Sequence, residues 1–201
     1  PDSTFVAAAQ HLLAAQQDQG RKVELQRIDF RTLARGDTAA ATATTMAARA
    51  TAFANGWGYK EPRDDGEMAP VWGSMTCAGI VGLTICEAAI RDLPVAKRDP
   101  RLLQEIVRAR DDGFAWLAEH MSPRFHPGAI QHRQQWLYYW LYSLERAALL
   151  SSTALIQDRD WYFEGAMVLA SAQLADGHWP PEVLWEQAIE RNAMAILFLK
   201  Q

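Results

Sequence analysis

The sequence has no long hydrophobic run and no excess of basic residues. No window approaches the roughly 18 consecutive apolar residues of a bilayer span, so we expect no membrane-spanning segment. Lys and Arg number 20 against 24 Asp and Glu, for a net charge of −4, and they form no stripe. A nucleic-acid partner is therefore not expected. With 49% hydrophobic residues in 201, the chain can build one sizeable core.

Cysteine is scarce, and its spacing excludes a disulfide. Cys77 and Cys86 lie nine residues apart on one predicted helix. At about 100° and 1.5 Å per residue they point to opposite sides, roughly 13 Å apart. A disulfide needs Cα atoms within about 7 Å. We therefore predict two free thiols, buried as small hydrophobic side chains.

Cofactor and metal motifs are also missing. No G-x-S-x-G, Walker A or G-x-G-x-x-G string opens a helix after a strand, so neither nucleotide binding nor serine hydrolysis is indicated. The residues His120, His126 and His132 are six apart, and no H-x-x-x-H pair shares a helical face. The sequence predicts no metal and no cofactor.

Helical periodicity dominates, and no alternating β-branched run is long enough for a sheet. We therefore predict an all-α protein. The predicted helices cover about 4–17, 37–53, 74–91, 100–120, 133–150, 158 or 160 to 174, and 181 or 182 to 199, with a short one near 28–34. Asp111 and Asp112, like Asp158 and Asp160, are interpreted as acids at helix starts, where the macrodipole favours them.

A helix that runs into a Gln, a tight Asp-Gly turn and a Trp occurs near the C-terminus, and its end is echoed at Gly56-Trp57. Such repetition predicts a fold of helical hairpins, whose second helices begin near 74, 133 and 182. The middle copy has Met121-Ser122-Pro123 in place of the Gly-Trp end. We expect Trp57 and Trp179 to seal their hairpins, each indole N–H with a partner.

The residues of this motif are Gly165, Leu169, Gln173, Gly177 and Trp179. They match the QW-type motif of the prenyltransferase/squalene-cyclase repeat superfamily, and from about Phe5 to Leu199 the chain loosely resembles its uncharacterised bacterial members. The resemblance implies an α/α toroid. Since a closed ring in that family needs considerably more than about 200 residues, we expect a partial ring of about seven or eight helices in a single domain, residues 1–201.

The start at Pro1 without a Met favours either an exported product whose leader has been removed or a piece of a longer polypeptide. The sequence does not distinguish between cellular compartments. The open edge of a partial ring is expected to meet further domains of the same chain or a partner, including a second copy.

The catalytic signatures of the superfamily are absent. The nearest string to the cyclase D-x-D-D motif is Pro62-Arg63-Asp64-Asp65, which lacks the first Asp. Its Arg lowers a carboxyl pKa, whereas a proton donor must stay protonated. The prenyltransferase zinc pattern needs an Asp two residues before a Cys, and Met75 stands there before Cys77. Standard cyclase and prenyltransferase chemistry is not expected.

The helix 133–150 carries the candidate binding surface. One face is apolar and is expected to pack on the outer helices, so that the opposite face looks into the central cavity of the ring. The opposite face carries two phenols, a hydroxyl, an amide and a cation, which suit a prenyl chain, a sugar ring or a peptide. We predict a noncatalytic ligand- or protein-binding module that uses this concave face. Its candidate residues are Gln135, Tyr139, Tyr142, Ser143 and Arg146.

Two enzymatic alternatives remain open. A polysaccharide lyase or hydrolase would use Tyr139, Tyr142, Arg146 and His132. Hydrolysis also needs two carboxylates about 5 to 10 Å apart, for which the candidates are Asp64, Asp65, Glu67 and Glu87. The second alternative is a prenyl-lipid enzyme with a non-standard acid.

Overall fold

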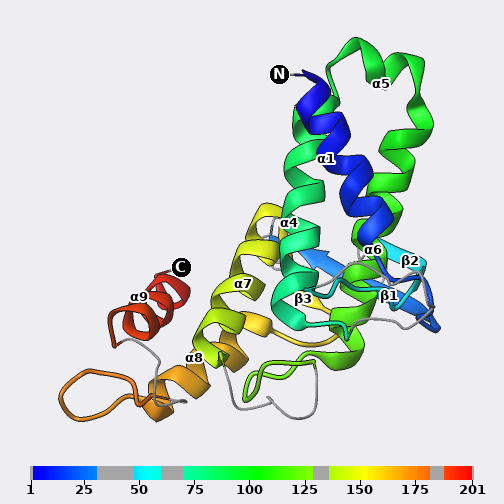
Figure 1. Ribbon diagram of the computed structural model, residues 1–201. Helices are drawn as coiled ribbons and strands as arrows, with labels where there is room; N and C mark the ends of the chain where they lie inside the picture. Colours follow the sequence, from blue (N-terminus) through cyan, green and yellow to red (C-terminus); the bar gives the residue numbers. More distant parts are fainter. Residues whose placement is uncertain (1, 31–47, 60–69, 129–135, 182–187, 201) are drawn as a thin grey trace.

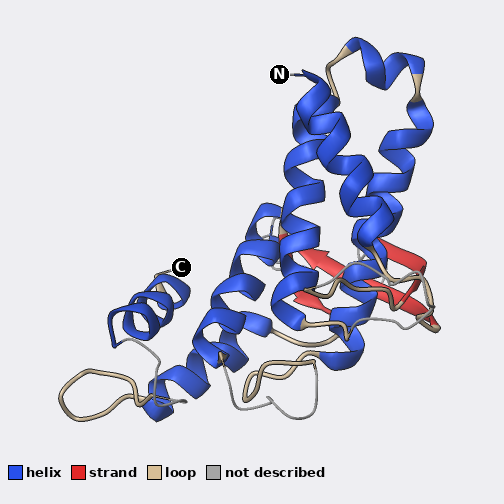
Figure 2. Ribbon diagram, viewed as in Figure 1, coloured by secondary structure: helices blue, strands red, loops and turns tan. Residues whose placement is uncertain are grey.

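The computed structural model describes residues 2–30, 48–59, 70–128, 136–181 and 188–200. These residues form seven α-helices and a three-stranded antiparallel sheet (Figure 2). The prediction of an all-α protein, an α/α toroid, is therefore wrong, and the fold is mixed α/β. The elements are α1 (Asp2–Ala15), β1 (Lys22–Asp29), β2 (Ala48–Phe53), α4 (Gly73–Ile90), α5 (Pro94–Arg98), α6 (Pro100–His120), α7 (Leu137–Leu150), β3 (Thr153–Ile156), α8 (Trp161–Ala172) and α9 (Ala188–Leu199).

The sheet has the order β2-β1-β3, and both pairings are antiparallel. Strands β1 and β2 leave and re-enter the helical framework at one place, between α1 and α4 (Figure 1). There the Gly20 N–H donates to Asn55 Oδ1 at 2.8 Å, and the Ala54 N–H donates to Arg21 O at 2.9 Å. The β1/β2 segment is thus inserted into the turn of a helical hairpin.

The predicted helices near 28–34 and 37–53 are wrong where the structure describes them, because Ile28 lies in β1 and 48–53 form β2. The rest of both segments lies outside the described residues. Strand β1 buries Leu25 and Ile28, a spacing of three that imitates a helix. Strand β2 is rich in Ala, the strongest helix former. Pairing with β1 overrides that propensity.

Helix α4 lies at the centre of the helical part. It runs antiparallel to α6, since Ile80 meets Gly113 and Glu87 meets Arg110 farther along. It runs parallel to α7, since Gly73 lies against Trp140 at one end and Thr84 Oγ1 lies 3.1 Å from Ser151 Oγ at the other. Helix α1 packs on a third side, where Gly82 meets Leu12 (Figure 1).

By length and composition, α4 is the one helix among the described residues that is apolar enough to cross a membrane. It is also the core helix, with 56% of its residues buried inside the protein. Its packing against α1, α6 and α7 accounts for its apolar composition. Cys77 and Cys86 both lie on α4, and the prediction that they are free and buried is confirmed.

The two tryptophans of the repeated motif make the same contact. Trp57 Nε1 donates to Leu12 O at 2.8 Å, and Trp179 Nε1 donates to Leu169 O at 2.8 Å. Both side chains are 3% exposed. Leu12 stands four residues before Gln16, as Leu169 does before Gln173. The α1/α4 and α8/α9 hairpins therefore share a hydrogen bond from a tryptophan indole to a leucine carbonyl, which we call the indole fastening. In the first hairpin the β1/β2 insertion separates Leu12 from Trp57 in the sequence.

The glycines of the motif have distinct roles. Gly177 adopts φ +85°, a left-handed conformation that favours glycine in its turn. At Gly165 an added Cβ would lie 2.5 Å from Phe198, so glycine permits the close approach of α8 and α9. At Gly56 an added Cβ would lie 2.4 Å from Val71. Gln173 Nε2 donates to Gly177 O at 2.9 Å and so closes the turn that precedes Trp179.

Candidate functional site

Helix α7 has an apolar, buried side and an opposite side that carries the predicted binding residues. Tyr139, Tyr142 and Ser143 are half-buried and Arg146 is exposed. Gln135 lies outside the described residues. The opposite side of α7 is buried in the core through Trp140, Leu141, Leu144, Ala147 and Ala148. The amphipathic pattern of the sequence therefore corresponds to the packing of this helix.

An ion pair neutralises the cation on this face. The Arg146 guanidinium binds both carboxylate oxygens of its neighbour Glu145, whose side chain is fully buried. This hydrogen bonding to Glu145 raises the pKa of Arg146. The guanidinium also lies over the Tyr142 ring, 5.6 Å from its centroid, within the range of a cation–π contact. The positive charge of Arg146 on this face is therefore balanced by Glu145.

Helix α4 extends this surface. Ser74, Ala78, Val81 and Ile85 follow one another at helical spacing, and Ala78 and Ile85 are exposed. This stripe points away from α6, which packs on the side of Ile80 and Glu87.

Tyr59 lies where the α4 stripe meets α7. Its hydroxyl lies 3.4 Å from Ser74 Oγ. Burial raises the pKa of Tyr139, and the nearby Tyr59 raises it further. We refer to the combined surface as the α4/α7 face, which consists of Tyr59, Ala78, Val81, Ile85, Tyr139, Tyr142, Ser143 and Arg146.

A buried imidazole supports one end of this face. His126 Nε2 accepts a hydrogen bond from the Ser74 N–H at 3.0 Å, and Pro127 O accepts one from the Gly73 N–H at 2.8 Å. The ring lies between Trp72 and Trp140, at centroid distances of 5.3 and 5.9 Å. Burial lowers the pKa of His126 from 6.5 to about 4. A neutral His126 therefore caps the first turn of α4.

His126 also has a buried atom with no partner. Its Nδ1 is shielded from solvent and makes no hydrogen bond. Because Nε2 accepts a hydrogen bond from the Ser74 N–H, the neutral ring carries its own proton on Nδ1. Burial of the ring makes a second proton on it costly, as its lowered pKa indicates.

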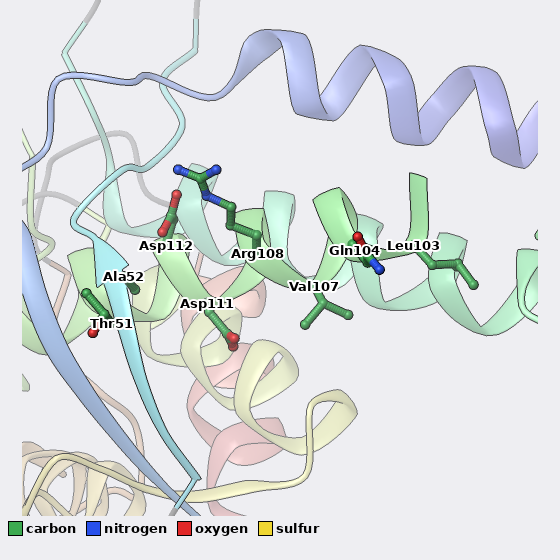
Figure 3. Close-up of a pocket in the computed structure, with 8 residues that line it drawn as sticks. All are labelled: Thr51, Ala52, Leu103, Gln104, Val107, Arg108, Asp111 and Asp112. Atoms are coloured by element: carbon green, nitrogen blue, oxygen red, sulfur yellow. The ribbon is translucent and has the colours of Figure 1, made fainter. Parts of the chain in front are cut away.

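A separate pocket of about 430 Å³ lies between α6 and β2 (Figure 3). Asp111 and Asp112 stand at one end of it, and both already have partners. Asp111 Oδ1 lies 2.6 Å from Arg27 Nη2 of β1, and Asp112 accepts hydrogen bonds from the Phe53 N–H and the Asn55 side chain. The pocket is lined by Thr51, Ala52, Leu103, Gln104, Val107, Arg108, Asp111 and Asp112.

The interpretation of Asp111 and Asp112 as helix-start acids is wrong, because both lie deep within α6 and join it to the inserted strands. Burial raises the pKa of Asp112 despite these hydrogen bonds. For Asp160 the interpretation is confirmed, since its side chain accepts the Phe163 N–H as the N-cap of α8. These acids serve the fold.

Of the other catalytic candidates, the structure describes Glu87, which lies on the side of α4 that packs on α6. Glu87 pairs with Arg91 at 2.5 Å and with Arg110, and so joins α4 to α6. Asp64, Asp65, Glu67 and His132 lie outside the described residues. Within the part of the chain that the structure describes, no three His, Cys, Asp or Glu side chains are grouped to hold a metal ion.

Sequence reasoning missed Tyr59, Ser74 and His126 as parts of this site. Each lies in a different segment from α7, and a helical wheel orders only residues of one helix. One signal was present for Tyr59, which directly follows the Gly56-Trp57-Gly58 turn. The fastening of Trp57 to α1 holds that turn, and with it Tyr59, at the start of α4.

In comparisons with known proteins, the chain matches no family model, no curated protein and no solved structure.

Proposed function

We propose that the chain is a noncatalytic binding module that captures a protein segment on its α4/α7 face. The observation that carries the proposal is the composition of that face. Two half-buried tyrosines and an arginine stacked on one of them lie on α7, and the adjacent helix α4 exposes Ile85. Tyr and Arg are enriched among the residues that dominate protein–protein binding energy, and an exposed aliphatic side chain adds apolar area.

The electrostatics of the face favour a peptide with little net charge. Glu145 neutralises Arg146, while the hydroxyls of Tyr59, Tyr139 and Tyr142 offer hydrogen bonds to a peptide backbone. We retain the resemblance to the prenyltransferase/squalene-cyclase repeat superfamily as part of the proposal. The shared Leu, Gln and Trp fastening of two hairpins supports it.

The test is a selection of random peptides displayed on phage, followed by affinity measurements on three variants. We expect Tyr142→Ala and Arg146→Ala each to lower the affinity for the selected peptides by about tenfold or more. Each substitution removes a stacked aromatic or cationic contact. Phe30→Ala, a matched loss of an exposed aromatic directly after β1, should leave affinity unchanged. Failure to select any peptide, or equal affinity for all variants, contradicts the proposal.

Farnesyl diphosphate and cellohexaose serve as competitors in the same experiment. A prenyl-lipid or polysaccharide role predicts that one of them displaces the peptide and raises the melting temperature of the protein. A peptide-binding role predicts that neither does.

A further inference from the structure

A second surface, distinct from the α4/α7 face, lies on the outer side of α8. There the helix and the loop after α6 enclose a groove of about 610 Å³. Two large apolar side chains of α8 stand in it largely open to solvent, Phe163 at 61% and Met167 at 52% exposure. Contiguous exposed apolar groups of this kind mark interaction surfaces. The groove is lined by Pro123, Arg124, Phe163, Glu164, Met167, Val168, Ser171 and Ala172.

Among the residues that the structure describes, the groove has one positive charge without an acidic partner. Its acid, Glu164, already pairs with Arg159 through both guanidinium nitrogens Nε and Nη2. Arg124 is exposed, and no acidic partner of its guanidinium is found among the described residues. An apolar partner that brings a carboxylate to the Arg124 end therefore complements the groove.

Helix α9 of the same chain has those properties. Ile189 is 83% exposed and Ile196 is 55% exposed, and Ala193 and Leu197 are exposed between and beside them. Their spacing of four, seven and eight residues places them on one side of the helix. The exposed Glu190 stands next to Ile189, at the N-terminal end of this stripe. An amphipathic helix with such anchors fits an apolar groove.

Neither surface is used by the α8/α9 hairpin itself. Within the chain, α9 packs on α8 through Phe198, which is fully buried against Gly165 and stacks on Tyr162 at a centroid distance of 5.6 Å. Each copy therefore presents both the groove and the stripe. A contact in which each copy gives its stripe and receives the other's closes as a symmetric dimer.

We propose that the chain forms a dimer in which the α9 stripe of one copy seats in the α8 groove of the other, with Glu190 facing Arg124. The partner's helix covers Phe163 and Met167, which explains the exposure of both side chains in the single chain. The charge pair sets the direction of the helix in the groove, since the reversed direction would place Glu190 away from Arg124.

The test is the oligomeric state, measured by sedimentation velocity over a wide range of protein concentration. The wild type should be dimeric. Arg124→Glu and Glu190→Arg should each raise the dimer dissociation constant by about tenfold or more, because like charges then meet. The double variant Arg124→Glu/Glu190→Arg should restore the dimer, and Arg101→Glu, on the exposed side of α6, should not change it.

A wild type that stays monomeric overturns the proposal. So does a dimer that ignores both single reversals, and so does a double variant that stays as weak as the single ones. Far-UV circular dichroism of each variant shows that loss of the dimer is not loss of the fold. To test the apolar contact in the groove, Phe163→Asp should also abolish the dimer.

Discussion

The imidazole of His126 caps α4 by accepting the Ser74 N–H at 3.0 Å, although 52 residues separate the two in the sequence. The imidazole replaces the short polar side chain that commonly accepts this bond at a helix start. Residue 72, which precedes the helix, is a Trp and supplies no such acceptor. Protonation of Nε2 would break this bond and place a charge beside the positive end of the helix.

The His126 cap makes stability depend on pH. The unfolded chain takes up a proton on this ring below pH 6.5, whereas the folded chain does so only near pH 4, so acid favours unfolding between these values. We expect the free energy of unfolding to fall by about 3 kcal/mol from neutral pH to pH 4 through this residue.

Urea denaturation at several pH values checks this expectation. His126→Gln keeps a side-chain acceptor and removes the titrating group, so its free energy of unfolding should vary less with pH than that of the wild type. Parallel pH profiles for the two proteins would contradict the assigned role of His126.

Two glycines of α4 give a matched pair for packing. A Cβ at residue 79 would lie 2.4 Å from the rigid indole of Trp57, whereas one at residue 82 would lie 2.6 Å from the flexible end of Leu12. Gly79→Ala should destabilise by about 1 to 3 kcal/mol through overpacking. Gly82→Ala should stay within about 1 kcal/mol of the wild type, because the helix propensity of Ala offsets a small shift of Leu12. Equal melting temperatures for the two variants would refute the tight contact.

Loss of either indole fastening is expected to lower the free energy of unfolding by a similar amount. Trp57→Phe and Trp179→Phe each remove the N–H that binds a backbone carbonyl of α1 or α8, together with part of a buried ring. We expect each to lower the free energy of unfolding by about 1 to 3 kcal/mol in urea titrations. Trp136→Phe, at an exposed position, should change it by no more than about 0.5 kcal/mol. A similar change in the free energy of unfolding for all three variants would contradict a stabilising role for the two indole hydrogen bonds.

Tyr139 is expected to ionise late. Burial raises the pKa of Tyr139 above 10.0, so the unfolded state releases this proton first as pH rises. The stability contributed by the neutral phenol is full below pH 10 and is lost above it. Phenolate absorbance during alkaline titration should show a delayed component in the wild type that is smaller by one tyrosine in Tyr139→Phe. A wild-type titration without a delayed group would place Tyr139 in water.

The sequence predicts the long helices well because each obeys one periodicity. The prediction of a helix from residue 100 to about 120 matches α6, and the one from 74 to 91 matches α4 within a residue at each end. The short α5 was not predicted. The strands were not predicted because they depend on long-range contacts. Strand β1 pairs with β3, which follows α7 far along the chain. A strand whose partner lies so far away carries little local signal of its own.

The site divides in the same way. Tyr139, Tyr142, Ser143 and Arg146 share one side of one helix, so a helical wheel is sufficient to group them. The neutralisation of Arg146 by Glu145 was not predicted, because adjacent residues of a helix usually point in different directions. Tyr59 and Ser74 join the group only through the fold, as do the two walls of the α8 groove.

The binding role of the α4/α7 face is tested most directly by site-specific photo-crosslinking to a peptide selected on the wild-type protein. A benzophenone side chain placed at residue 142 should crosslink the peptide, while one placed at residue 163 on α8 should not. Crosslinking from residue 163 alone, or from neither position, would contradict a binding role for this face.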